Sequence, residues 1–92
     1  MPRFITPRIA YTDQKIRDFA QLPVGWHYGE GKPPTQERID QARTLNIGAA
    51  LWGFEKTNAF PGIDGEIQVT VYHGNLCLEL TLELDNSMTV VL

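Results

Sequence analysis

The feature that most constrains this chain is a strict alternation of apolar and polar residues over positions 66–84. Odd positions are apolar from Ile67 to Val71, and every even position is leucine from Leu76 to Leu84. A period of two places successive side chains on opposite faces of a β-strand, so both runs predict half-buried strands. The pattern therefore predicts a hairpin with strands at 66–73 and 76–84.

The residues between these two runs predict how the strands pair. Gly74 and Asn75 suit a two-residue turn with a positive φ at the glycine. This turn gives a register that keeps the apolar residues of both strands on one face. The pairs in this register are Val71 with Leu78, Val69 with Leu80 and Ile67 with Leu82.

The same test of register predicts a final strand at 88–92. A three-residue loop at 85–87 sets Leu84 opposite Met88 and keeps the apolar residues of both strands on one face. A two-residue loop would mix the faces, so we reject it. The accepted loop also pairs Leu82 with Val90 and Leu80 with Leu92.

A fourth strand is predicted upstream, at 58–62. Asp64 and Gly65 form a strong turn signal that sets Phe60 beside Val69. Pro61 is tolerated in such a strand if it lies at the edge of the sheet. The result is a four-stranded antiparallel meander.

Two segments in the first half of the chain predict helices. In residues 12–22, Thr12 is a candidate N-cap, and Ile16 and Phe19 follow at helical spacing. A second helix is predicted at 35–52, where the buried stripe comprises Ile39, Ala42, Leu45 and Ala49. With both helices on one face of the sheet, residues 1–92 form a single α+β domain. Residues 1–10 are expected to be an irregular arm.

Charge and cysteine content exclude several classes of protein. The chain has 8 basic and 11 acidic side chains and a net charge of −3, which argues against a nucleic-acid binder that works by bulk charge. Residues 51–92 hold one basic and six acidic side chains, so this half suits a cationic or neutral partner. The single Cys77 rules out an internal disulfide framework and suits a reducing cytoplasm. No apolar run suggests a signal peptide or a membrane span, so we expect a cytoplasmic protein.

The segment from Pro23 to Pro34 is too rich in glycine and proline for a regular element. Its aromatic residues Trp26 and Tyr28 are candidate binding residues, because aromatic side chains on a restrained loop are frequent interface anchors. Trp26 could instead lie under the loop and complete a small core, and we leave both interpretations open. Tyr28 is the better candidate for exposure.

Groups that could carry chemistry are scattered along the sequence. His27 and His73 lack the close ligand pairs of a zinc site, so we expect no metal or cofactor. Cys77 has no predicted base beside it. The acids Glu66, Glu79 and Glu83 fit a solvated outer face. The enzyme alternative is a small hydrolase or transferase that uses the loop, with His27, Glu30 and Tyr28 as acid–base candidates.

Val90 and Val91 lie in a predicted final strand that carries no charge. Such an edge can pair with a second copy or with a strand of another protein. Alternatively, further residues of a longer chain continue the sheet. We therefore expect a non-enzymatic protein-binding module, self-associating or bound to a protein partner, with an antitoxin-like or regulatory role as one use. The candidate binding residues are Trp26, Tyr28, Val90 and Val91.

Three segments together resemble a group of short bacterial proteins of unassigned function. The segments are the loop at 25–33, the helix with Ile39 and Ala42, and the turn at 60–67. Those proteins tend to read Gly-Trp-Asp-Gly-Tyr-Gly-Ala-x-Pro before a helix, a Pro…Asp-Gly turn and a strand pair. In this chain His27 replaces the acid and Tyr28 replaces a glycine. The resemblance covers about residues 23–84; it implies a small bacterial or phage-borne domain and assigns no catalytic residue.

Overall fold

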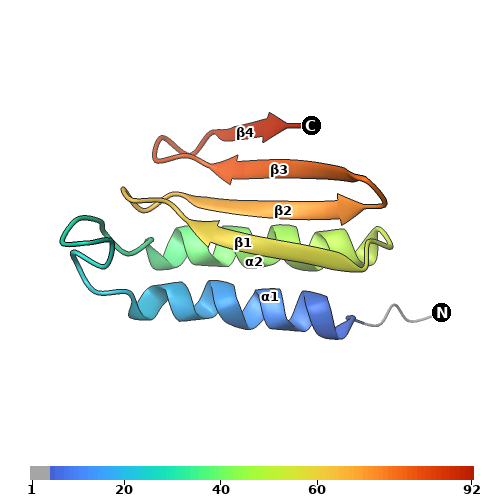
Figure 1. Cartoon of the computed structure of the whole chain (residues 1–92), viewed down its shortest axis with the longest axis horizontal. Helices are drawn as coiled ribbons and strands as arrows, with labels where there is room; N and C mark the ends of the chain where they lie inside the picture. The colour runs from blue at the N-terminus through green and yellow to red at the C-terminus, as the bar shows by residue number, and fades with distance from the viewer. Residues whose placement is uncertain (1–4) are drawn as a thin grey trace.

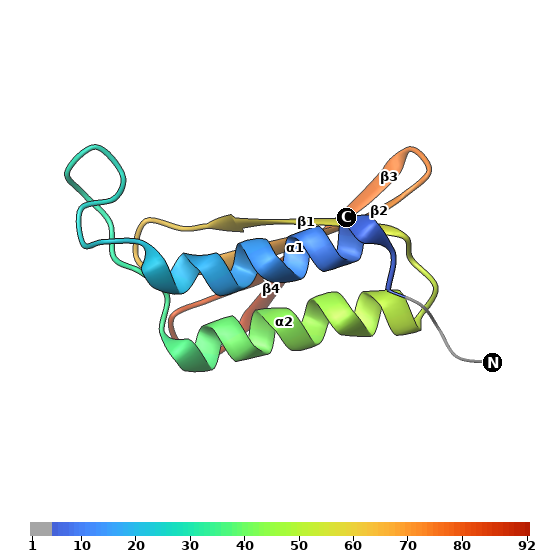
Figure 2. The same ribbon diagram turned by 90° about the horizontal axis from the view of Figure 1, so that it is seen from below.

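The computed structural model describes residues 5–92 and has two layers, a pair of helices and an antiparallel sheet (Figure 1). Both helices lie on the same face of the sheet (Figure 2), and the strand order is β1-β2-β3-β4. The α+β meander predicted from the sequence is confirmed. In chain order the elements are α1 (Pro7–Asp18), the 3-10 turn η1 (Phe19–Gln21), α2 (Gln36–Leu51), β1 (Lys56–Pro61), β2 (Ile67–His73), β3 (Leu76–Leu82) and β4 (Met88–Val91).

Helix α1 begins five residues earlier than the sequence pattern predicts. Thr6 is its N-cap, with a side chain that accepts a hydrogen bond from the Ile9 amide at 3.2 Å, and Pro7 opens the helix. Proline suits this position because its fixed φ is helical and its missing N–H has no partner there. The predicted arm at 1–10 is thus wrong for residues 7–10, and residues 1–4 lie outside the described part. Thr12, the predicted cap, is buried in mid-helix.

Helix α2 agrees closely with the prediction for 35–52. Thr35 is the N-cap and accepts a hydrogen bond from the Arg38 amide at 3.2 Å. Ile39, Ala42 and Ala49 are buried as the predicted stripe requires, and Leu45 is partly buried against the same core.

The central hairpin has the predicted register. Val71 lies opposite Leu78, Val69 opposite Leu80 and Ile67 opposite Leu82. Gly74 has a φ of 61°, as the two-residue turn requires.

The register of β1 differs from the prediction by one residue. Ala59, not Phe60, lies opposite Val69, and Phe60 pairs with Gln68. The cause is a three-residue loop, Ile63–Gly65, in place of the two-residue turn, closed by a 2.8 Å hydrogen bond from the Gly62 amide to the Glu66 carbonyl. Ala59 is consequently fully buried and Phe60 is on the outer face.

The register of β4 differs from the prediction by two residues. Leu82 pairs with Met88 and Leu80 with Val90, whereas the sequence predicts Leu84 and Leu82 at these places. The loop comprises residues 84–86 instead of 85–87, because Asn86 takes a φ of 70° at the last loop position. A shift of two keeps each side chain on its predicted face but moves Leu84 out of the sheet.

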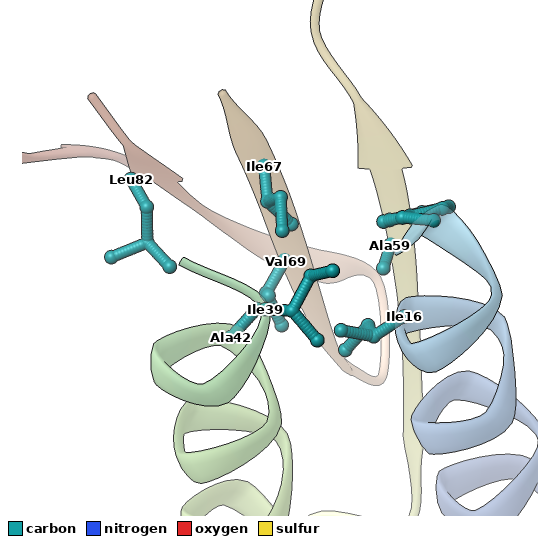
Figure 3. Packing of buried hydrophobic residues seen from close by; sticks show 8 residues of the cluster. Ile16, Ile39, Ala42, Ala59, Ile67, Val69 and Leu82 are labelled. Carbon is teal, nitrogen blue, oxygen red and sulfur yellow. The ribbon is translucent and has the colours of Figure 1, made fainter. Parts of the chain in front are cut away.

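The hydrophobic core lies between the helices and the first two strands (Figure 3). β3 contributes Leu82 to this cluster, whereas Leu78 and Leu80 are only partly buried. The eight buried members are Ile16, Phe19, Ile39, Ala42, Ala59, Ile67, Val69 and Leu82.

A buried polar network links the two helices to β1. The Asn46 amide of α2 donates to the Ile9 carbonyl of α1 at 3.0 Å, and its oxygen accepts from the Thr57 hydroxyl of β1. The Thr12 hydroxyl donates to the Thr57 carbonyl at 2.9 Å. Each side chain therefore has a partner, as buried polar groups require.

Candidate functional site

The helices cover only one half of the sheet. Helix α1 packs on β1, and α2 packs on β2 with a smaller contact to β3 (Figure 2). The helix-side face of β3 and β4 is consequently left open, although it is entirely apolar. We call this surface the open face; it comprises Leu76, Leu78, Leu80, Met88, Val90 and Leu92.

Exposure is high toward the free edge of the open face. Val90 is 54% exposed and Leu92 is 90% exposed. Val91, which the sequence analysis groups with Val90, lies opposite Glu79 and therefore belongs to the other face of the sheet. Contiguous exposed apolar surface of this kind marks interaction sites in many proteins.

The free edge of β4 has unpaired backbone groups at alternate residues. A hydrogen bond of 2.9 Å from the Glu83 amide to the Ser87 carbonyl fixes the phase of the ladder. In an antiparallel pair this phase directs Thr89 and Val91 toward β3 and directs Met88 and Val90 outward. Within residues 5–92, nothing bonds to the outward N–H and C=O groups of Met88 and Val90.

The opposite edge of the sheet, at β1, is partly protected. The ladder phase directs residues 57, 59 and 61 outward. The Thr57 carbonyl accepts from the Thr12 hydroxyl at 2.9 Å, and the Ala59 amide donates to Asn58 Oδ1 at 2.8 Å. Pro61 has no N–H to offer. Two of the outward groups of β1 thus have side-chain partners and one position lacks an N–H, whereas the outward groups of Met88 and Val90 have no such protection.

Two hollows border the open face. One is a groove of about 660 Å³ between α2 and β3, with Leu45 and Leu82 as its apolar part and Glu37 and Asp40 on the helix side. The other, of about 210 Å³, lies at the far end of the hairpin and is lined by Phe54, Val71, His73, Leu76, Cys77, Leu78 and Leu92.

The β3–β4 turn is fastened to the start of α2. The Arg38 guanidinium donates to Asn86 Oδ1 at 3.2 Å, and Arg38 is buried. In the same turn, hydrogen bonds from the Ser87 hydroxyl and amide lower the pKa of the Asp85 carboxyl below its ordinary value. This turn therefore holds β4 at a defined distance from the helical layer.

The loop between the helices forms a second candidate surface, and Trp26 is part of its internal structure. The Trp26 indole donates to the Lys32 carbonyl at 3.2 Å, and the Gly25 amide donates to the Gly31 carbonyl at 2.8 Å. Gly31 lies directly against the indole ring. Trp26 is half-buried within its own loop and is not a member of the hydrophobic core.

Tyr28 lies at the tip of this loop and is 96% exposed. Its φ of 52° is unusual for a bulky residue. The His27 ring packs edge-on against the Tyr28 ring, with centroids 4.9 Å apart. The loop projects from the end of the helical layer, whereas β4 is the edge strand far from α1 (Figure 1). The structure therefore does not bring Trp26 and Tyr28 together with Val90 and Val91.

The titratable groups singled out by the sequence do not converge on one site. His27 and Glu30 are joined through their backbones, and neither side chain lines the hollows described above. Glu83 accepts from the Thr89 hydroxyl at 2.7 Å, and Glu66 accepts from the Asp64 amide at 2.9 Å. Across positions 5–92 no three His, Cys, Asp or Glu side chains are grouped as metal ligands.

Neither helix of the described region is long and apolar enough to span a bilayer. Comparisons with protein-family models, with curated proteins and with solved structures find no match to this chain. The open face with the edge of β4 is the best-defined part of the candidate site.

Proposed function

We propose that this chain is a non-enzymatic protein-binding module that works by strand addition at β4. The observation that supports this proposal is the contrast between the two edges of one sheet. Two side chains and a proline protect part of the edge at β1, whereas Met88 and Val90 present free backbone groups at β4. A partner strand would fill these positions with main-chain hydrogen bonds.

The open face supplies the second part of the binding energy. An added strand would place every second side chain beside Val90 and Met88, on the apolar side of the sheet. Removal of apolar area from water contributes about 25 cal/mol per Å², and each backbone hydrogen bond contributes a net of about 0.5–1.5 kcal/mol. Main-chain pairing gives affinity, and the side chains on the open face select the partner.

We propose no catalytic function for this chain. The hydrolase or transferase alternative needs His27, Glu30 and Tyr28 around one space, and Tyr28 instead points into solvent. The group of proteins that the sequence resembles has no assigned function, so the geometry of β4 and the open face alone supports the proposal. A regulatory or antitoxin-like role would be one use of such a module.

The proposal is tested with a proline at the outward position of β4. Val90→Pro removes an outward N–H and leaves the ladder to β3 intact, because that ladder uses the groups of Thr89 and Val91. Val90→Thr is the control, since threonine has the shape of valine and keeps the N–H. Both variants serve as tagged bait for a second, differently tagged copy and for an extract of the source cell.

We expect the wild type and Val90→Thr either to retain a stoichiometric extract protein or to pair with the second copy at about 0.5 mM, and we expect Val90→Pro to do neither. Circular dichroism and thermal unfolding of the three proteins verify that each is folded. The proposal is wrong if no extract protein is retained and the chain also stays monomeric at about 0.5 mM, or if Val90→Pro associates as strongly as Val90→Thr.

A further inference from the structure

We infer that the strand added to β4 is β4 of a second copy, paired antiparallel about a two-fold axis at Val90, so that two sheets become one sheet of about eight strands. This inference rests on the proposed function, because it names the occupant of the same edge. It specifies a register that the proposed function alone does not.

Symmetry favours a second copy because the edge is complementary to itself. In an antiparallel pair related by a two-fold axis, residue numbers that face each other have a constant even sum. Even residues therefore always meet even residues, and the apolar side chains of Met88, Val90 and Leu92 stay on one face. A strand of unrelated sequence has no such guarantee.

The position of the axis follows from the ladder phase. With the axis at Val90, Val90 meets its own symmetry mate, and Met88 meets Leu92 of the second copy. Leu92 follows β4 directly. With the strand continued by this one residue, the outward groups of all three residues are used, giving about six backbone hydrogen bonds. An axis at Thr89 or at Val91 pairs only two of the three outward residues and gives about four. The Val90 axis therefore satisfies the most groups among residues 88–92.

The helical layer leaves room for this arrangement. Helix α1 lies over β1, and α2 lies over β2 with a smaller contact to β3, whereas β4 is the edge strand far from α1 (Figure 1). In the joined sheet the two helical layers therefore stay at the outer ends. The open faces of the two copies become one continuous apolar surface between the two α2 helices.

The dependence of binding on salt distinguishes a second copy from a cationic partner. Residues 88–92 carry no charge, but each chain has a net charge of −3. Two copies repel each other weakly over a distance that salt screens, with a Debye length of about 8 Å at physiological ionic strength. Self-pairing should therefore strengthen as salt is added, whereas binding of a cationic partner should weaken.

The two β4 strands would bury little surface, so we expect a weak dimer. A pair of five-residue strands buries less than the roughly 1,200 Å² of a stable interface. We therefore expect a dimer that dissociates at micromolar protein concentrations and forms at about 0.5 mM. Sedimentation equilibrium at low and at high salt over this range measures both the mass and its salt dependence.

Cysteine pairs test the register directly. With the axis at Val90, Thr89 lies opposite Val91 of the second copy in a non-hydrogen-bonded pair, with Cβ atoms about 4.5–5.5 Å apart. In a Cys77→Ser background, Thr89→Cys and Val91→Cys are prepared as separate proteins. Each is oxidised alone and in an equal mixture, at about 0.5 mM and under mild conditions. We expect the mixture to give a disulfide-linked heterodimer several-fold more abundantly than either protein alone gives a homodimer.

Other results overturn the inference, each in a recognisable way. A disulfide in Thr89→Cys alone would place the axis at Thr89, and one in Val91→Cys alone would place it at Val91. A dimer by mass with no disulfide in any sample would show that the copies meet elsewhere, for example through their open faces. A monomer at 0.5 mM would exclude the second copy, and the proposed function would then survive only if the extract supplied a protein that Val90→Pro fails to retain.

Discussion

Asn86 and Gly65 occupy equivalent places in two three-residue turns of this protein. Each is the last residue of its loop, and their φ values are 70° and 102°. A loop of this kind is a type I turn followed by a residue in the left-handed region, where glycine and asparagine are tolerated best. These two residues therefore determine where β2 and β4 begin, and hence which strand residues face each other.

Asn86→Ala tests this role at the β3–β4 turn. A Cβ-bearing residue without a local hydrogen bond costs about 1–2 kcal/mol in the left-handed region, so we expect a loss of unfolding free energy of about that size. Asn86→Gly is the control, because it also loses the Arg38 contact but relieves the backbone. Urea unfolding of both variants measures the difference. Equal stability of the two variants would contradict the role given to the backbone.

Gly31 determines how Trp26 packs within the loop between the two helices, residues 23–34. An added Cβ would lie 2.7 Å from Trp26 Nε1, whereas a Cβ at Gly29 meets nothing within 4 Å. Both glycines have positive φ, so Gly29→Ala controls for the backbone cost alone. In a Trp52→Phe background, we expect Gly31→Ala to shift the Trp26 emission toward the red, since the indole loses its packing. The same spectrum for both variants would contradict this packing.

The Asp85 carboxyl is sensitive to its hydrogen bonds. The Ser87 hydroxyl and amide, the latter at 2.9 Å, both bond Asp85 Oδ1 and lower its pKa below the ordinary value of 3.8. A lowered pKa means that the folded state favours the ionised form, so the turn is stabilised above pH 3.8 and loses this contribution as pH falls through the folded-state pKa.

Ser87→Ala removes the hydroxyl donor and keeps the amide donor. We expect the pKa of Asp85 to rise toward its ordinary value in this variant, as followed by NMR titration of the side-chain carboxyl signal. Thr89→Ala is the control, because its hydroxyl bonds Glu83 and not Asp85. An unchanged pKa of Asp85 in Ser87→Ala would assign the shift to another cause.

At the scale of elements, the sequence predicts best where two independent signals agree. The β2–β3 hairpin has both a specific turn and alternating strands, and its predicted register is confirmed. The β1–β2 and β3–β4 turns have one signal each, because Asp-Gly and Asp-Asn-Ser each allow more than one loop length. The sequence pattern does not predict the start of α1, because Pro7 is compatible both with an irregular arm and with the first turn of a helix.

The buried network of Asn46, Thr57 and Thr12 is an element-scale contact that no sequence pattern predicts, since its members lie on three separate elements. Thr57→Val keeps the shape of the side chain and leaves the Asn46 oxygen without its donor. We expect a loss of about 1–3 kcal/mol of unfolding free energy, measured by urea unfolding.

Thr89→Val makes the same substitution on an exposed site of β4 and is the control. We expect it to change stability by less than about 0.5 kcal/mol. If both variants lose a similar amount, the network does not have the buried, low-dielectric character that we assign to it.

At the scale of the whole molecule, the decisive property is the offset between the layers. The sequence predicts both helices on one face of the sheet but not which strands they cover. A signal is present, because half of the α2 stripe is alanine while the even positions of β3 are all leucine. Small side chains on a helix cover little of the sheet, so the helices bury only some of the leucines of β3. The uncharged strand makes Val90 and Val91 candidate binding residues, and because they are adjacent in the strand, only Val90 lies on the open face.

Amide hydrogen exchange, followed residue by residue by NMR at low and high protein concentration, tests the central claim most directly. At low concentration we expect Thr89 and Val91 to be protected by β3 and Met88 and Val90 to exchange rapidly. At high concentration the Met88 and Val90 amides should become protected, while the Ala59 amide at the β1 edge should show the same protection throughout. Rapid exchange of Val90 at every concentration and in the presence of every protein that binds the chain would contradict association through β4.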